Sequence, residues 1–359
     1  MGPALSGDVR VAPDGTVHVC YYQSTAKVQR WDGAVWVPVG GPASCGQSWQ
    51  NFLFFDGDSN VLVASRDYDS PGNLNVHRRI AGAPWEVLNM DGVCPSYSGT
   101  FFQNVHNPVG ISLGGGVGFL RGPDNLVLLV LDGPSSDQRP TALTRRGGTW
   151  ELLGSQRFSQ ARASSVSLGH SGGEFWAAYW EDYQGGQLCL SRYDRAAQDW
   201  QLEATEALRG DYTTLAEGHG QQFVITNDLD TPGRALRSYS RRGADLVRVG
   251  GVIAAGVDMG QQGWIQQVSA AQDSKQRLYV AYSYDDPSTG LDSRIGISRL
   301  TRSSAGFLVW KVYTLADPGV HDVSFVTMDL DPATDTIYVG HTQASPQDGM
   351  DLYSIQITD

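Results

Sequence analysis

The chain has 359 residues, of which 41% are hydrophobic and 18% charged, a balance that predicts a folded protein and excludes a disordered one. Its formal net charge of −12 excludes a general binder of nucleic acid or anionic membrane and is compatible with neutral sugars, cations or basic protein partners. No apolar run approaches the roughly 18 residues of a transmembrane helix, so we expect no membrane insertion.

One four-part pattern begins at the first residues and recurs along the chain. In its first occurrence the parts read VRVAPDG, TVHVCYY, VQRWDG and AVWVPVGG. An alternating run reaches a turn, an apolar run follows, a third run ends in a basic or turn cluster, and a short run containing Trp closes the unit. Alternating apolar and polar residues between turn signals are typical of β-strands, so each unit predicts a four-stranded antiparallel meander.

The pattern predicts seven units within a single domain of residues 1–359. We place them at residues 8–49, 50–94, 117–155, 163–208, 212–254, 264–316 and 322–359. The third unit opens with GFLRGPDN, after a Gly-rich stretch at residues 95–116. Meanders repeated in this number are typical of an all-β, seven-bladed β-propeller. A sandwich is the alternative, but it does not need one pattern repeated seven times.

The seventh unit ends at DLYSIQITD and has no closing run with Trp. We expect residues 1–7, which precede the first strand of the first unit, to supply the missing fourth strand. Pairing the two ends of the chain would remove two exposed sheet edges at once, which are liabilities in soluble proteins.

The four cysteines fall into two groups. Cys45 and Cys94 both precede an aromatic–Gln–Asn triplet, which indicates equivalent loops that hold either a disulfide or two free thiols. Cys20 and Cys189 lie in strand-like runs and are expected to be small buried side chains. No two cysteines have the spacing of a structural zinc site.

Candidate binding residues gather in two classes of loop. In a meander blade, the loops between the second and third strands lie on the same face as the loops that join blades. The first class is acidic, with Asp67, Asp69, Asp182, Asp228, Asp230, Asp285 and Asp286. The second is aromatic and amide-rich, with Trp49, Gln50, Asn51, Tyr97, Phe102, Gln103, Asn104, His106, Tyr212, Trp264, Gln266 and His321.

Aromatic rings stack on the C–H faces of a sugar, and amides and carboxylates bind its hydroxyls, so this face predicts a carbohydrate or cell-surface glycan as the ligand. The alternative is structural: Asp is common in turns because it caps them. DGDSN (residues 56–60) and DLDPATD (residues 329–335) raise the further hypothesis of bound calcium, although neither has the length or closing Glu of an EF-hand loop. His170 and His219 occupy equivalent turns between first and second strands, on the opposite face, and we interpret them as turn residues.

The strand pairs VAPDGTVHVCYY and SAAQDSKQRLYVAYSYDD resemble those of secreted β-propellers of the sialidase-repeat type and of the propeller lectins. The sialidase box Ser-x-Asp-x-Gly-x-x-Trp is not intact, and neither the arginine triad nor the Tyr–Glu pair of a sialidase is recognisable. The resemblance implies a secreted or periplasmic protein whose leader is absent from this sequence, because MGPALSGDVR has no basic start and no apolar core.

Three functions remain open at this point. The first is a lectin-like binding module without catalysis. The second is a carbohydrate-active enzyme, either a glycoside hydrolase or a polysaccharide lyase with His106, Tyr97 and Tyr212 as candidate residues. The third is a protein–protein scaffold. The motifs of serine hydrolases, zinc proteases and phosphate-binding loops are absent from the sequence, which favours binding over catalysis.

Overall fold

The structure is a computed structural model that describes residues 7–23, 25–41, 48–56, 58–67, 74–88, 111–113, 126–132, 137–183, 185–230, 235–255, 268–285, 293–314, 323–331, 333–343 and 350–356. The regular elements among these residues are strands, and the sheets are almost entirely antiparallel. The expectation of an all-β protein is therefore confirmed. No helix long and apolar enough to cross a membrane occurs in the described ranges.

The sheets are up-and-down meanders in which strands neighbour one another in chain order. The first contains β1 (Gly7–Val11), β2 (Val17–Gln23), β3 (Thr25–Trp31) and β4 (Trp36–Pro38). The second contains β5 (Ser48–Phe55), β6 (Val61–Asp67), β7 (Leu74–Arg79) and β8 (Trp85–Val87). The third contains β9 (Ile111–Leu113), β10 (Leu126–Asp132), β11 (Arg139–Arg146) and β12 (Thr149–Leu152).

The next two meanders share one eight-stranded sheet, because Thr205 and Asp245 form a parallel bridge between their outer strands. They contain β13 (Ala163–Ser171), β14 (Glu174–Glu181), β15 (Gln187–Asp194) and β16 (Asp199–Ala207), then β17 (Gly210–Gly218), β18 (Gln221–Asp228), β19 (Ala235–Arg242) and β20 (Asp245–Ala255). A four-stranded sheet follows with β21 (Val268–Gln272), β22 (Leu278–Asp285), β23 (Ser293–Arg302) and β24 (Leu308–Thr314). The last sheet has β25 (Val323–Asp331), β26 (Thr336–Gln343) and β27 (Met350–Gln356).

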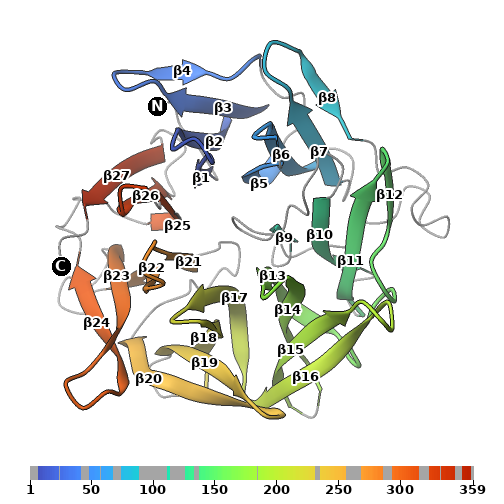
Figure 1. Ribbon diagram of the computed structural model, residues 1–359, viewed down its shortest axis with the longest axis vertical. Coiled ribbons are helices and arrows are strands. Elements are labelled where there is room, and N and C mark those ends of the chain that lie inside the picture. The colour runs from blue at the N-terminus through green and yellow to red at the C-terminus, as the bar shows by residue number, and fades with distance from the viewer. Residues whose placement is uncertain are drawn as a thin grey trace.

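The meanders are arranged around a common centre in a propeller-like ring, with the first strand of each nearest the centre (Figure 1). Apolar clusters lie between neighbouring meanders and bury the face that each sheet cannot cover alone. The ring closes in the same way: Val9, Val19 and Tyr21 of the first meander form one cluster with Met350 of the last. The core is therefore a set of interfaces between meanders.

The tryptophans of the outer strands connect consecutive meanders. Trp150 and Trp200 are buried, as expected for closing runs that pack on a neighbour. The indole N–H groups donate hydrogen bonds into the preceding meander: Trp85 to the carbonyl oxygen of Gly41 (2.8 Å), Trp150 to that of Leu88 (3.3 Å), Trp200 to that of Leu153 (2.7 Å) and Trp310 to the Ser238 hydroxyl (3.0 Å). These contacts give the repeated closing run its physical role, because a buried indole N–H needs a partner.

A glycine beneath the indole completes this contact in three of the described meanders. Gly40 and Gly154 follow the outer strands β4 and β12, and Gly250 lies within the outer strand β20; their φ angles are 72°, 84° and 74°. A Cβ atom on them would lie 3.0, 2.9 and 2.8 Å from the nearest indole atom of the next meander. Glycine is required here for its backbone conformation and for the close approach of the ring.

The structure corrects one predicted boundary and leaves part of the predicted ring closure undescribed. The first strand of the third meander is β9, which pairs with β10, so it begins before the predicted start at Val117. Of the closing strand expected at residues 1–7, Gly7 instead begins β1 and pairs with Tyr21 of β2, and residues 1–6 lie outside the described residues. Cys20 and Cys189 are buried as predicted, whereas Cys45 and Cys94 are not described.

Candidate functional site

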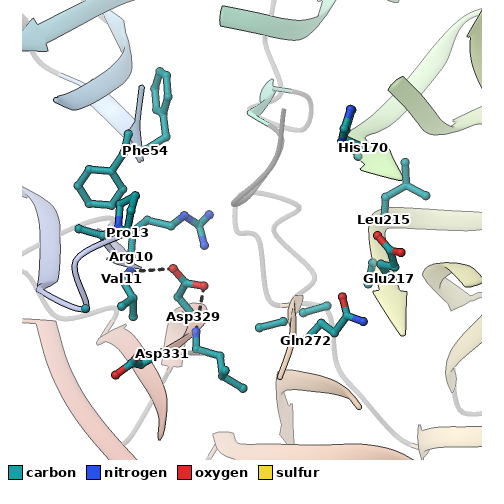
Figure 2. Close-up of a pocket in the computed structure, with 18 of the residues that line it drawn as sticks. Arg10, Val11, Pro13, Phe54, His170, Leu215, Glu217, Gln272, Asp329 and Asp331 are labelled. Carbon is teal, nitrogen blue, oxygen red and sulfur yellow. Dashed lines mark hydrogen bonds between the residues drawn. The ribbon is translucent and has the colours of Figure 1, made fainter. Parts of the chain in front are cut away.

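A cavity of about 540 Å³ lies at the centre of the ring. Its lining residues come from the ends of the first strands β1, β5, β13, β17, β21 and β25, from the turns that follow them, and from Gln222 at the start of the second strand β18. Figure 2 shows two opposing sides, with Arg10, Val11 and Asp329 on one and His170, Leu215 and Glu217 on the other. The site is therefore assembled from segments that lie far apart in the sequence.

The first side is organised by Arg10. Its guanidinium lies 3.3 Å from the Asp8 carboxylate and donates to the backbone oxygens of Leu53 (3.2 Å) and Met328 (3.4 Å). These partners belong to the first, second and last meanders, so the arginine joins three units of the ring. Its guanidinium reaches into the cavity (Figure 2), but part of its charge and of its donors is used by these protein partners.

Two carboxylates complete this side. Asp8 accepts from the Leu53 amide (2.9 Å) and the Thr327 hydroxyl (2.7 Å). Asp329 accepts from the amides of Val11 (2.7 Å) and Leu330 (2.9 Å), as the dashed lines in Figure 2 show. Burial raises the pKa of both carboxyl groups, and the nearby guanidinium opposes this effect. Both groups hold the ring together where it closes, which gives them a structural role.

The opposite side carries polar groups with few protein partners. Glu217 is half-buried in β17, in register with Gln222 of β18, and no hydrogen bond or ion pair to it is found within the described residues. The Nε2 atom of His170 is buried and likewise lacks a hydrogen-bond partner in that part of the chain. The His170 ring is tilted against Phe175, with centroids 5.3 Å apart. Of these groups, the Glu217 carboxylate is the one that is half-exposed on the cavity wall.

Apolar surface lies beside these polar groups. Phe54 and Leu215 line the cavity, and Gly169 on β13 offers no side chain, so that Leu215 approaches its backbone closely. A Cβ atom on Gly169 would lie 3.3 Å from Leu215 Cβ. Concave sites with apolar walls and a few converging polar groups are the usual form of small-ligand sites. Amides, a carboxylate and an imidazole are suited to binding hydroxyl groups through hydrogen bonds.

The calcium hypothesis rested on two turns whose carboxylates are occupied in the structure. Asp56 accepts from the amides of Asp58 (3.0 Å) and Asn60 (2.9 Å), and Asp331 accepts from the Ala333 amide (2.9 Å) and the Thr334 hydroxyl (2.7 Å). These are bonds by which Asp stabilises its own turn. Within the described ranges, no three or more His, Cys, Asp or Glu side chains are grouped so as to hold a metal ion.

The structure describes the side chains of only some predicted site residues. Asp228 is fully buried and forms ion pairs with Arg237 (2.9 Å) and Arg248 (3.2 Å), so its carboxylate is not presented to solvent. Asp182 and Asp230 are exposed, and Asn51 is buried in β5. For a further group only the backbone is described, within strands: Trp49, Gln50, Asp67, Tyr212 and Asp285.

The remaining predicted residues lie outside the described ranges: Asp69, Tyr97, Phe102, Gln103, Asn104, His106, Trp264, Gln266, Asp286 and His321. The predicted loop face therefore stays a prediction. The cavity lies at the other end of the strands, where first and second strands connect, and sequence reasoning did not identify it. His219 is a turn residue as expected, with φ of 50°. His170, expected to be a turn residue like His219, instead lies in β13, pairs with Phe175 and lines the cavity. The strand registers place it at the position that Glu217 occupies in the next meander, so its match to His219 in the sequence pattern is wrong.

Neither known protein families nor curated proteins give a match to this sequence. Solved structures do. A protein of unknown function from Dyadobacter fermentans is similar with a TM-score of 0.53 and 15% identity, over 83% of this chain and 94% of that chain. Sqt1 of Saccharomyces cerevisiae is similar with a TM-score of 0.51 and 12% identity, over 98% and 85%.

A third similar structure is an ulvan lyase from a new family of polysaccharide lyases, bound to -[GlcA(1-4)Rha3S]-. Its TM-score is 0.54 at 11% identity, over 99% of this chain and 96% of that chain. At such identities the similarity concerns the fold alone, and function has to be argued from the site.

Proposed function

We propose that the chain is a seven-bladed β-propeller that binds carbohydrate without catalysis, in the manner of a lectin, and that it works outside the cytoplasm. The succession of meanders and the apolar clusters between them support the propeller, including the cluster between the last meander and the first. Residues 1–6 would complete the last blade. Similarity to a polysaccharide lyase is consistent with a carbohydrate-related function.

The observation that carries the binding proposal is the central cavity. Its volume of about 540 Å³ is in the range of small-ligand pockets, and a saccharide of one to two units is of this size. Gln222, Gln272 and Glu217 offer donors and acceptors for hydroxyl groups, and Phe54 offers an apolar face. The loop face predicted from the sequence is retained as a second surface for a longer glycan.

A glycan array with labelled protein tests the proposal, run once with calcium and once with a chelator. Binding to a defined set of glycans is the expected result, with an affinity per site on the order of 0.1–1 mM that multiple contacts raise. Loss of binding in the chelator would indicate that a cation takes part in binding. A blank array with folded protein would refute the proposal and favour a protein–protein scaffold.

A polysaccharide lyase is the alternative, because a structure of that class shares the fold. A lyase needs a base that removes the proton beside the uronate carboxylate and a positive group that neutralises this carboxylate. In the cavity Arg10 is already engaged by Asp8 and by backbone oxygens, which disfavours this reaction there. Incubation with uronate polymers, followed by ultraviolet absorbance of the unsaturated product, separates the two functions.

A further inference from the structure

We propose that the central cavity selects a sugar that carries a free ammonium group, and that Glu217 is the carboxylate that binds this group. The inference rests on the proposed carbohydrate binding and names the class of sugar. It follows from the charged side chains on the two sides of the cavity. Arg10 on one side is paired with a carboxylate of the protein, whereas Glu217 on the other side has no paired cation among the described residues.

The positive side chain of the cavity is already paired with a carboxylate of the protein. Among the described residues that line the cavity, Arg10 is the only arginine or lysine, and its guanidinium lies 3.3 Å from the Asp8 carboxylate. The carboxylate of Asp329 lies on the same side of the cavity (Figure 2). A uronate or sulfate group entering the cavity would therefore meet carboxylates before it met a free cation, and like charges in close contact disfavour a ligand strongly.

The carboxylate of Glu217, across the cavity from Arg10, is not paired with a cation of the described residues. Glu217 is half-buried, faces Arg10 and Asp329 from the other side, and has no described partner that neutralises it. A partly buried carboxylate is screened less than one on the surface, so it attracts a cation more strongly. An ammonium group placed here would form a charge-assisted hydrogen bond, which is about twice as strong as a neutral one.

The surroundings of Glu217 favour a sugar over a bare polyamine. Gln222 lies opposite Glu217 in the β17–β18 register, and Gln272 and His170 line the same cavity from the flanking meanders. Amide and imidazole groups pair with hydroxyls, which an aliphatic polyamine does not have. The arrangement therefore matches a hydroxylated ring bearing an amine.

The test is calorimetric titration of the full chain with glucosamine oligomers, with their N-acetylated counterparts and with oligogalacturonate, at a pH where the amine is protonated. We expect the glucosamine oligomer to bind about tenfold to a hundredfold more tightly than the N-acetylated one, as for a hydrogen bond to a charged group. Glu217→Gln should remove this preference and leave binding of the N-acetylated oligomer unchanged. Glu151→Gln is the matched control, because Glu151 is exposed on the outer strand β12 and pairs with Arg146.

Each other outcome has a definite meaning. Equal binding of the two oligomers, or a preference that survives Glu217→Gln, overturns the inference while the proposed carbohydrate binding stands. Tighter binding of oligogalacturonate also overturns the inference and favours the alternative function, a polysaccharide lyase. Competition by spermidine as effective as that of glucosamine oligomers overturns the choice of a sugar. If no saccharide binds to folded protein in any assay, the proposed function itself fails.

Discussion

Gly154 provides the sharpest test of how the meanders are held together. It follows β12 with φ of 84°, and a Cβ atom on it would lie 2.9 Å from Trp200 Cδ1 and 3.3 Å from Asp199 Cα. Alanine in this backbone conformation costs about 1–2 kcal/mol. Forcing the indole away costs about 1–3 kcal/mol more, because the neighbouring meander is already packed. We expect Gly154→Ala to lower the free energy of unfolding by about 2–5 kcal/mol.

Gly173 is the matched control. It has nearly the same backbone conformation, with φ of 81°, but no atom lies within 4 Å of its Cβ position. Gly173→Ala should therefore cost only the conformational part, about 1–2 kcal/mol. Urea unfolding followed by fluorescence and circular dichroism gives both values, provided that the two transitions coincide. Equal costs for the two substitutions would refute the close contact between glycine and indole.

Three further predictions concern stability. Removal of residues 1–6 should lower the melting temperature if they close the last blade, and an unchanged value would exclude this role. Trp310→Phe should cost about 0.5–1.5 kcal/mol in urea unfolding through loss of its indole hydrogen bond, and a smaller cost would show that the bond is not needed. Burial lowers the pKa of His18, His77 and His341 below the ordinary 6.5, so they contribute stability above pH 6.5 that is lost as the pH falls toward their folded pKa values. Urea midpoints between pH 8 and 5 should fall less for His77→Leu than for the unaltered protein, and parallel curves would contradict this.

The strands could be predicted largely because local chemistry sets them. The turn after β5 shows why: the Asp56 side chain accepts amides of its own turn, so the residues needed for the hairpin are adjacent in the sequence. The closing tryptophans were recognisable for the same reason, because each occupies one place in a repeated run. Their hydrogen bonds into the preceding meander were not predictable from the run alone.

The cavity could not be predicted because its members meet only in the folded ring. The bond from the Val11 amide to Asp329 joins residues that are 318 positions apart in the sequence. The sequence analysis looked for function in acidic loops, where Asp residues were conspicuous. Asp228 shows the weakness of that signal, since it is buried and paired with Arg237. A charged residue in an innermost strand, such as Glu217, was the more informative feature.

The most direct test of the account is whether a glycan identified on the array binds in the central cavity. Gln272→Trp places an indole at the end of β21, where the amide side chain lines the cavity. Phe307→Trp is the control, because Phe307 is 71% exposed at a peripheral turn. With both variants folded, we expect the affinity to fall at least about tenfold for Gln272→Trp, the loss of about 1.4 kcal/mol, and to stay unchanged for Phe307→Trp. Unchanged affinity for Gln272→Trp would contradict the central claim and place the binding site at the loop face.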